Sequence, residues 1–245
     1  MRSAEPRSEK EAIRVAREIA RKVYNEQIPA GTRLASEGEA LEQYKVSRAT
    51  LREALRYLQL HGAIDVRTGP SGGQFVADPD WHHLASTIAL LLQFANATIE
   101  TVMEARLCID PGMAALAARN ATAADLELMD GLLTEMRRQL NDYDTYYDLY
   151  LQLWDVLATS SGNALLSLLS PALRRITWTA GIRPNKALRQ GALYQLRAIR
   201  DAVASQDEET AYREMQYLES RYLDTMRAKH AREIRKVVSW ADSVR

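Results

Sequence analysis

Between residues 84 and 229, apolar residues recur at intervals of three and four, the spacing that places them on one face of a helix. Leu84, Ile88 and Leu91 begin the pattern, and it resumes after each short polar or glycine-containing interruption. No stretch of useful length alternates apolar with polar residues, as a half-buried strand does. These residues are therefore predicted to form an all-α bundle of six or seven helices.

The composition is typical of a soluble globular protein that is long enough for two domains. The chain has 245 residues, 47% of them hydrophobic and 26% charged, and its formal net charge is zero. Its longest clean apolar run, Ile88–Leu92, is far shorter than a membrane span, and residues 1–14 lack the apolar core of a signal peptide. The single cysteine, Cys108, excludes an internal disulfide, and we expect it to be buried on a helix. We expect a cytoplasmic protein without membrane contact.

The first 78 residues begin with two predicted helices, each opened by an S-x-x-E capping box. Ser8 and Glu11 open the first helix, which ends at the sequence IPAG. Ser36 and Glu39 open the second helix, which is short. The predicted apolar faces consist of Ile13, Ala16, Ile19, Ala20 and Val23 in the first helix and of Ala40, Leu41 and Tyr44 in the second.

A third predicted helix and a hairpin complete this segment. Ser47 is placed to cap the helix, and Gly62 is placed to end it. The apolar residues of this helix are Leu51, Ala54, Leu55 and Leu58. Two short predicted strands, IDV and QFV, then flank the loop RTGPSGG. The fold is therefore predicted to be mostly α, with a winged helix-turn-helix domain over residues 1–78, a linker at ADPDW, and an all-helical domain over residues 79–245.

The third helix carries a row of arginines, Arg48, Arg52 and Arg56, on the side opposite its apolar residues. In a winged helix-turn-helix domain this helix enters the major groove of double-stranded DNA, where its exposed face donates hydrogen bonds to bases and phosphates. Arginine donates to both, because its guanidinium presents paired N–H groups. Such a row alone is also typical of a solvated helix face. The tight turn before it and the glycine-rich hairpin after it favour DNA binding.

The segment from Ala30 to Val76 resembles the DNA-binding domain of the GntR family of bacterial transcription regulators. It contains the family's G-x-x-L-x-S-E and V-S-R-x-T-L-R-E-A-L-x-x-L motifs and a glycine-rich wing that ends in G-x-F-V. The resemblance implies DNA contacts in the major groove and at the wing tip. The predicted DNA-contacting residues are Arg33, Ser47, Arg48, Ala49, Thr50, Arg52, Arg56, Thr68 and Gly69. The family usually has an arginine after S-E, where this chain has Gly38, so we expect one fewer contact per half-site.

The remaining sequence is similar to the ligand-sensing domain of the FadR branch of that family. The resemblance is carried by MEARLCIDPGMAALAARNATAADL, SSGNALL and RAIRDAVASQDEETAYREM. It implies a helical bundle that encloses an effector cavity. In many members, one aspartate and three histidines bind a metal there, and the metal holds a small carboxylate.

This sequence departs from that ligand set at all four positions, which hold Tyr150, Trp154, Leu196 and Leu218. A zinc or nickel site needs lone pairs from imidazole or carboxylate groups, and these side chains supply neither. The four histidines of the chain lie elsewhere in the sequence. We therefore predict no metal and no other cofactor.

The cavity is instead predicted to take a bulkier and more apolar effector, such as an acyl-CoA thioester, which some relatives sense, or another apolar or carboxylic ligand. The candidate effector contacts are Arg106, Tyr150, Trp154, Trp178, Leu196, Tyr217 and Leu218. Arg106 either clamps an anionic group of the effector or forms an ion pair within the bundle. Tyr146, Tyr147 and Tyr194 are further candidates, either for the cavity lining or for the core.

Together these features predict a homodimeric transcription regulator that reads a short inverted repeat in double-stranded DNA under the control of a small-molecule effector. Repression that the effector relieves is the expected direction. Two alternatives are a metal-dependent sensor of a small carboxylate and a DNA-binding dimer without a ligand. The sequence has no nucleophile elbow, phosphate-binding glycine loop or metal-ligand spacing, so we do not expect an enzyme.

Overall fold

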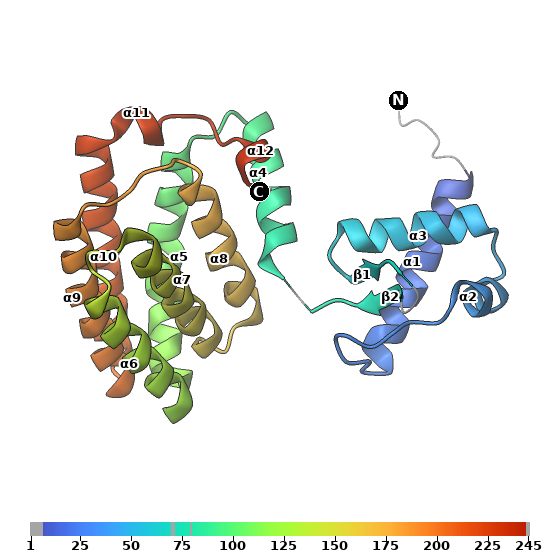
Figure 1. The fold of residues 1–245 in the computed structure, drawn as a ribbon, viewed down its shortest axis with the longest axis horizontal. Helices are drawn as coiled ribbons and strands as arrows, with labels where there is room; N and C mark the ends of the chain where they lie inside the picture. Colours follow the sequence, from blue (N-terminus) through green and yellow to red (C-terminus); the bar gives the residue numbers. More distant parts are fainter. Residues whose placement is uncertain (1–6, 70–71, 79, 244–245) are drawn as a thin grey trace. The chain divides into compact units, whose positions relative to one another are not determined.

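The computed structural model describes residues 7–69, 72–78 and 80–243, and the chain divides into two compact units, Met1–His83 and Leu84–Arg245. The described residues form twelve helices and one two-stranded antiparallel sheet (Figure 1). The sheet lies in the first unit, and the elements that the described residues form after it are all helices, which confirms the predicted mostly α fold class. In the described part of the chain, no helix is long and apolar enough to cross a membrane.

The first unit contains three helices and a hairpin. Its elements are α1 (Arg7–Asn25), α2 (Glu37–Tyr44), α3 (Arg48–Leu60), β1 (Ile64–Arg67) and β2 (Gly73–Val76). The hairpin register pairs Ile64 with Val76. A third, strand-like segment that was not predicted joins β2, because Arg33 forms a bridge with Phe75 and the Leu34 amide donates to the Gln74 carbonyl.

Local capping rules account for the boundaries of α2. The Ser36 hydroxyl accepts from the Glu39 amide, and the Glu39 carboxylate accepts from the Ser36 amide, so the predicted capping box is confirmed. At the other end Lys45 adopts a left-handed conformation with φ of 54° and turns the chain toward α3. The side chain of Ser8, predicted to cap the first helix, lies outside the described residues, and α1 begins at Arg7.

The ends of α3 also follow the prediction. The Ser47 hydroxyl accepts from the Thr50 amide at the N-terminal end. Gly62 follows the helix with φ of 68°, and the Ala63 amide donates back to the Leu58 carbonyl. This is the Schellman arrangement, in which glycine takes the left-handed position that other residues disfavour.

The core of the first unit forms mainly between α1 and α3. Its buried helical residues include Ala12, Val15, Ala16, Ile19, Leu51, Ala54 and Leu58. The predicted stripe of α3 is therefore confirmed, with Leu55 partly buried. The predicted face of α1 is wrong in part, because Ala20 is exposed and Ala12 and Val15 are buried. Two apolar stripes overlap on α1, and packing against α3 selects the one that contains Val15.

Seven helices of at least 14 residues follow the hairpin, as predicted. They are α4 (Trp81–Phe94), α5 (Ile99–Asn120), α6 (Ala123–Arg138), α7 (Tyr143–Ser160), α8 (Ala164–Trp178), α9 (Lys186–Ala204) and α10 (Glu208–Lys229). Two single turns, α11 (Ala231–Ile234) and α12 (Trp240–Ser243), were not predicted because four residues show no period. Cys108 is exposed on α5, so the expectation of a buried thiol is wrong.

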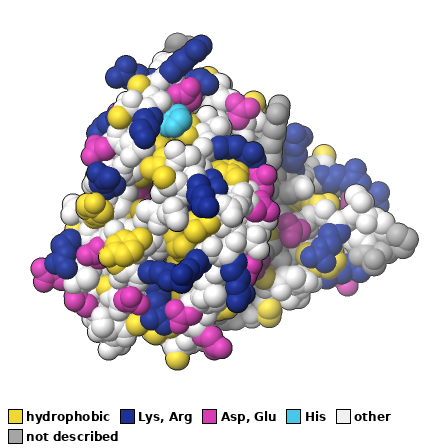
Figure 2. Space-filling view, turned by 60° about the vertical axis from the view of Figure 1, so that its left-hand side comes forward, with side chains coloured by type: hydrophobic (Ala, Val, Ile, Leu, Met, Phe, Trp, Pro, Cys, Tyr) yellow, Lys and Arg dark blue, Asp and Glu magenta, His cyan; other side chains and the backbone are white. Residues whose placement is uncertain are grey.

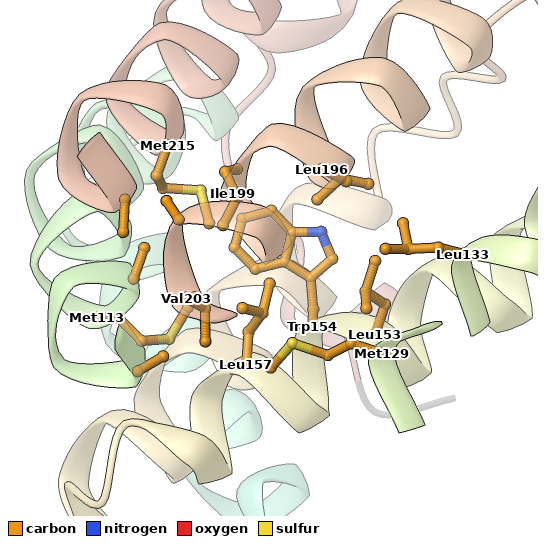
Figure 3. Close-up of a cluster of buried hydrophobic side chains, with 14 of the residues drawn as sticks. Met113, Met129, Leu133, Leu153, Trp154, Leu157, Leu196, Ile199, Val203 and Met215 are labelled. Atoms are coloured by element: carbon orange, nitrogen blue, oxygen red, sulfur yellow. The ribbon is translucent and has the colours of Figure 1, made fainter. Parts of the chain in front are cut away.

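The bundle packs α10 along α5 and α9, and α7 against α6 and α8. Its main core contains Trp154, and Figure 3 shows methionines and aliphatic side chains around the edge of the indole. The residues of this core come from five of these helices. Met113, Met129 and Met215 are fully buried there. Methionine fills irregular gaps around a large aromatic ring because its side chain is unbranched and flexible.

Candidate nucleic-acid interface and ligand cavity

The exposed side of α3 presents the predicted row of arginines. Arg48, Arg52 and Arg56 are all exposed, while the apolar stripe of the same helix is in the core. Ser47 and Ala49 are also exposed at the N-terminal end of the helix. Three guanidinium groups along one side of a rigid helix can donate to phosphate oxygens and to base edges in a groove.

Thr50 differs from these neighbours because its side chain is buried, with 8% of the residue exposed. Its hydroxyl lies 2.9 Å from that of Ser47, whose oxygen also caps the helix. Although the resemblance assigns Thr50 to the groove, the structure places it where it holds the start of α3 and offers little surface to DNA.

The second helix contributes little positive charge beside this row. Gly38 of α2 has open space where a side chain would be, and no basic residue takes the place of the arginine that the family has there. Glu37 instead lies 3.4 Å from Arg52. Both side chains are well exposed, so this ion pair is weak and leaves the guanidinium available to a polyanion.

Two further guanidinium groups, those of Arg67 and Arg33, lie against the hairpin. The Arg67 guanidinium lies 4.2 Å from the centroid of the Phe75 ring, in a cation–π contact. Arg33 lies against the backbone of Gly73, where a Cβ atom would come within 2.9 Å of its Nε. Thr68 and Gly69 are exposed where the loop leaves β1, and Pro70 and Ser71 lie outside the described residues. Arg67 was not among the predicted contacts, although the hairpin register places it diagonally opposite Phe75.

The second unit contains a cavity of about 380 Å³ with an aromatic wall. One face of α7 supplies Tyr143, Tyr146, Tyr147 and Tyr150, which follow the i, i+3, i+4, i+7 spacing. Trp178 of α8 stacks on Tyr147, with ring centroids 3.6 Å apart and 16° between the planes. These rings give the cavity a flat, largely apolar side.

The rim of the cavity lies on the surface of α9 and α10. Tyr194 of α9 and Tyr217 of α10 both line the cavity and remain 77% and 55% exposed. Arg221, one turn beyond Tyr217, is exposed and also lines it. On the face that Figure 2 turns forward, hydrophobic side chains in yellow lie among basic side chains in dark blue.

A buried network of two arginines and two carboxylates borders the cavity. Arg106 donates to Glu219 at 2.7 Å and to Asp110 at 3.3 Å. Arg174 donates to Asp110 at 2.9 Å and to the Tyr150 hydroxyl at 3.4 Å. None of the four charged residues is more than 4% exposed. Arg106 therefore forms the internal ion pair and lines the cavity at the same time, so its two predicted roles do not exclude each other.

Burial and these charges set the protonation states around the cavity. Burial lowers the pKa of Arg106, but Glu219 and Asp110 raise it by more, so its guanidinium stays charged. Burial raises the pKa of Glu219, against the opposing effect of Arg106. Burial also raises the pKa of Tyr143 to about 12 and raises that of Tyr150. The tyrosine hydroxyls are therefore protonated near neutral pH and can donate hydrogen bonds.

Five of the seven predicted effector contacts line the cavity, namely Arg106, Tyr150, Trp178, Tyr217 and Leu218. Trp154 and Leu196 do not, because each is 1% exposed and belongs to the core shown in Figure 3. Trp154 lies one turn of α7 beyond Tyr150. Its ring centroid is 3.3 Å from the guanidinium carbon of Arg174, so the indole lies behind a residue that lines the cavity.

Four charged residues of the lining were not predicted: Arg174, Arg189, Glu219 and Arg221. Arg106 and Glu219 are 113 positions apart in the sequence, so no local spacing relates them. Arg189 donates to the backbone carbonyls of Leu140 and Pro184, and such contacts leave no sequence signal.

The four positions that the family resemblance aligns with metal ligands belong to one cluster. Trp154 and Leu196 are part of the core, and Tyr150 and Leu218 pack against it. None of these side chains offers a metal a strong ligand. Among the residues that the structure describes, no three His, Cys, Asp or Glu side chains come together in a way that could hold a metal ion.

Two family models match the chain. Residues 12–73 match the bacterial regulatory proteins of the gntR family, and residues 101–220 match the FCD domain. The chain belongs to the GntR family. Its predicted family is thereby confirmed, and the family consists of regulators rather than enzymes.

Similar proteins include regulators from several bacteria. The galactonate operon transcriptional repressor of Escherichia coli is 26% identical over 77% of this chain and 84% of its own length. The regulator LutR of Bacillus subtilis is 28% identical over 46% of this chain. The chain spans only 51% of the length of LutR. The solved structure of Streptococcus agalactiae GntR superposes with a TM-score of 0.71, covers 87% of this chain and 99% of its own, and is 21% identical, so it supports the fold alone.

Proposed function

We propose that this GntR-family protein is a homodimeric repressor that binds a short inverted repeat in double-stranded DNA. In this proposal α3 enters the major groove, and Arg48, Arg52 and Arg56 contact bases and phosphates. Arg33 and Arg67 of the wing contact the neighbouring backbone. The observation that carries the proposal is the row of exposed guanidinium groups on a capped helix, within the segment that matches the gntR family model.

A dimer follows from this mode of reading. One winged domain contacts half a site, and two related by a twofold axis read an inverted repeat. Repression is supported by the similarity to the galactonate operon repressor of Escherichia coli. Effector binding then favours one arrangement of the bundle, and only a difference in affinity between two arrangements can change DNA binding.

The effector binds in the cavity of the second unit without a metal. The cavity volume of about 380 Å³ lies near the lower end of the range for small-molecule sites, roughly 300–1,000 Å³. Its aromatic wall suits a bulky, largely apolar body. Of an acyl-CoA thioester only the acyl part would fit inside, whereas a free acid of moderate size fits whole. A metal-dependent sensor is the weaker candidate, because the four positions that the resemblance aligns with metal ligands hold Tyr150, Trp154, Leu196 and Leu218, which offer no strong ligand.

The test begins with selection of bound duplexes from a random DNA library by the full chain. Binding of the selected duplex is then followed by fluorescence anisotropy at several salt concentrations. We expect the logarithm of the affinity to fall linearly with the logarithm of the salt concentration, because phosphate contacts release counterions. We expect Arg48→Ala to weaken binding by about 1–3 kcal/mol and to relax the base preference.

Arg138→Ala is the matched control. Arg138 is an exposed helical arginine of the second unit, and its ion-pair partner is Glu135, on the same helix. This variant should bind the selected duplex as the wild type does. Equal affinities of the Arg48→Ala variant, this control and the wild type would exclude α3 as the recognition helix. Selection of sequences without twofold symmetry would exclude the symmetric dimer.

A further inference from the structure

Arg189, a buried arginine that lines the cavity, has no acidic partner among the described residues. Arg189 of α9 is 9% exposed, and it donates to the Leu140 carbonyl at 2.6 Å and to the Pro184 carbonyl at 2.7 Å. Among the described residues, no carboxylate lies within ion-pair distance of it. A guanidinium has five N–H groups, so donors remain after these contacts. A buried charge without a counter-charge is costly, and an anionic ligand would offset that cost.

A neighbouring tyrosine, Tyr143, has a hydroxyl without a hydrogen-bond partner among the described residues. The Tyr143 ring lies 5.6 Å from the Arg189 guanidinium and lines the same cavity. Its hydroxyl is buried and has no hydrogen-bond partner in the described structure. Burial keeps this hydroxyl protonated, so it is a donor without an acceptor. Arg189 and Tyr143 together form what we call the anion end of the cavity.

The opposite end of the α7 wall differs in this respect. There Arg106 and Arg174 are paired with Asp110 and Glu219, and the four charges cancel. The cavity lining and Asp110 together carry a net charge of two positive units. The excess comes from Arg189 and Arg221, which no described carboxylate balances. The field inside the cavity therefore favours one anionic group, placed away from Glu219.

The aromatic wall sets the shape of the rest of the ligand. Tyr143 and Tyr150 lie seven residues apart on α7, which is about 10 Å along a helix that rises 1.5 Å per residue. Between them the stacked pair of Tyr147 and Trp178 presents a flat surface. A flat, aromatic ligand body about two rings long matches this wall by offset stacking.

We propose that the cavity binds an aryl carboxylate, with the ligand's carboxylate on Arg189 and the Tyr143 hydroxyl and its rings along Tyr147 and Trp178. This inference rests on the proposed function, of which it names the effector class. The charge of the ligand is recognised by protein side chains alone, so binding does not require a metal.

The direct test is calorimetric titration of the full chain, in buffer with EDTA, with biphenyl-4-carboxylate. Two matched probes follow: biphenyl-4-carboxamide, which has the same shape without the charge, and decanoate, which has the charge without the flat body. We expect saturable binding of biphenyl-4-carboxylate and binding at least tenfold weaker for each of the other two. Equal binding of the carboxamide, equal or tighter binding of decanoate, or no binding of the aryl carboxylate would overturn the proposal.

Tyr143→Phe separates binding from folding. The hydroxyl that it removes has no partner, so the variant should melt at or above the temperature of the wild type. It should nevertheless bind biphenyl-4-carboxylate about tenfold more weakly, because a hydrogen bond to a charged group is lost. Tyr212→Phe is the control, since Tyr212 is an exposed residue of α10 outside the cavity lining. Equal affinity of the Tyr143→Phe variant and the wild type would contradict the anion end.

Arg189→Gln and Arg189→Lys complete the set. We expect the glutamine variant to lose the preference for carboxylate over carboxamide and the lysine variant to keep part of it. A retained preference in the folded glutamine variant would place the carboxylate elsewhere. These measurements contain no DNA, so they can fail while operator binding holds. Conversely, tight binding of biphenyl-4-carboxylate without any change in operator affinity would refute the effector role and leave this site intact.

Discussion

Replacing Asp110 by asparagine removes a carboxylate that accepts from both arginines of the buried network. Asp110 is fully buried, and its Oδ2 accepts from Arg106 at 3.3 Å and from Arg174 at 2.9 Å. Its Oδ1 accepts from the Ser170 hydroxyl at 2.9 Å. In the variant, Glu219 alone faces two buried guanidinium groups. Removing one partner of a buried ion pair costs about 3–5 kcal/mol, and we expect the free energy of unfolding to fall by about that amount.

The assay is urea unfolding of the full chain followed by tryptophan fluorescence. Three of the four tryptophans, Trp154, Trp178 and Trp240, lie in the second unit, so the signal reports mainly on the helical bundle. The control is Asp201→Asn, whose side chain is 72% exposed and pairs with Arg200 at 3.2 Å. An exposed ion pair contributes about 0.5 kcal/mol or less, so this variant should unfold almost as the wild type does.

The comparison of midpoints is valid where the slope of unfolding against urea is the same in all three proteins. A loss of less than about 1 kcal/mol in Asp110→Asn would refute the reasoning, because a buried pair of guanidinium groups would then tolerate the missing charge. A loss equal to that of Asp201→Asn would have the same meaning.

Two further predictions concern helix ends. In Gly62→Ala the added Cβ would lie 2.6 Å from the His83 ring at a φ of 68°, so we expect the free energy of unfolding to fall by about 1 kcal/mol or more. Gly38→Ala, in open space within α2, should raise the free energy of unfolding by about 1 kcal/mol. Thermal unfolding followed by circular dichroism measures both variants, and equal melting temperatures would contradict the conformational argument. The Thr145 hydroxyl lowers the pKa of Asp142, and the Thr210 amide lowers that of Asp207. Because the unfolded chain then binds more protons, the stability that these caps add is complete above the usual aspartate pKa of about 3.9 and is lost as the pH falls below it. Urea midpoints at pH 6 and pH 3.5 should differ less in the Asp142→Asn, Asp207→Asn double variant than in the wild type, and an equal difference would exclude these caps as a source of acid sensitivity.

Features that depend on a few neighbouring residues could be predicted from the sequence. Ser36, Glu39 and Ser47 cap their helices as expected, because an N-cap needs only the side chain and the next three residues. Gly62 ends α3 for an equally local reason. The arginine row of α3 is exposed because the opposite stripe is apolar enough to decide which side is buried.

Features that depend on partners distant in the sequence could not be predicted. Which face of α1 is buried depends on its packing against α3. The sequence of α1 has two overlapping apolar stripes, and in the structure the stripe with Val15 is buried whereas Ala20 is exposed. Trp154 and Tyr150 share one side of α7, but the wall of the cavity ends between them. Arg189 has only backbone acceptors, so nothing in its neighbourhood in the sequence marks it as a binding residue.

We propose that occupancy of the cavity controls DNA binding, and a variant that blocks the cavity tests this without a ligand. Gly191 of α9 lines the cavity and has open space at its Cβ position, so Gly191→Trp places an indole at the mouth. Gly131→Trp is the matched control, because Gly131 is also an open helical glycine but lies outside the lining.

The measurement is the Kd of each variant for the selected operator duplex, by fluorescence anisotropy at one salt concentration. We expect Gly191→Trp to bind the operator several-fold more weakly than the wild type and Gly131→Trp to bind it equally well. The Gly191→Trp variant must be folded and must no longer bind biphenyl-4-carboxylate. If that variant then binds the operator as tightly as the wild type does, control of DNA binding by the cavity is contradicted.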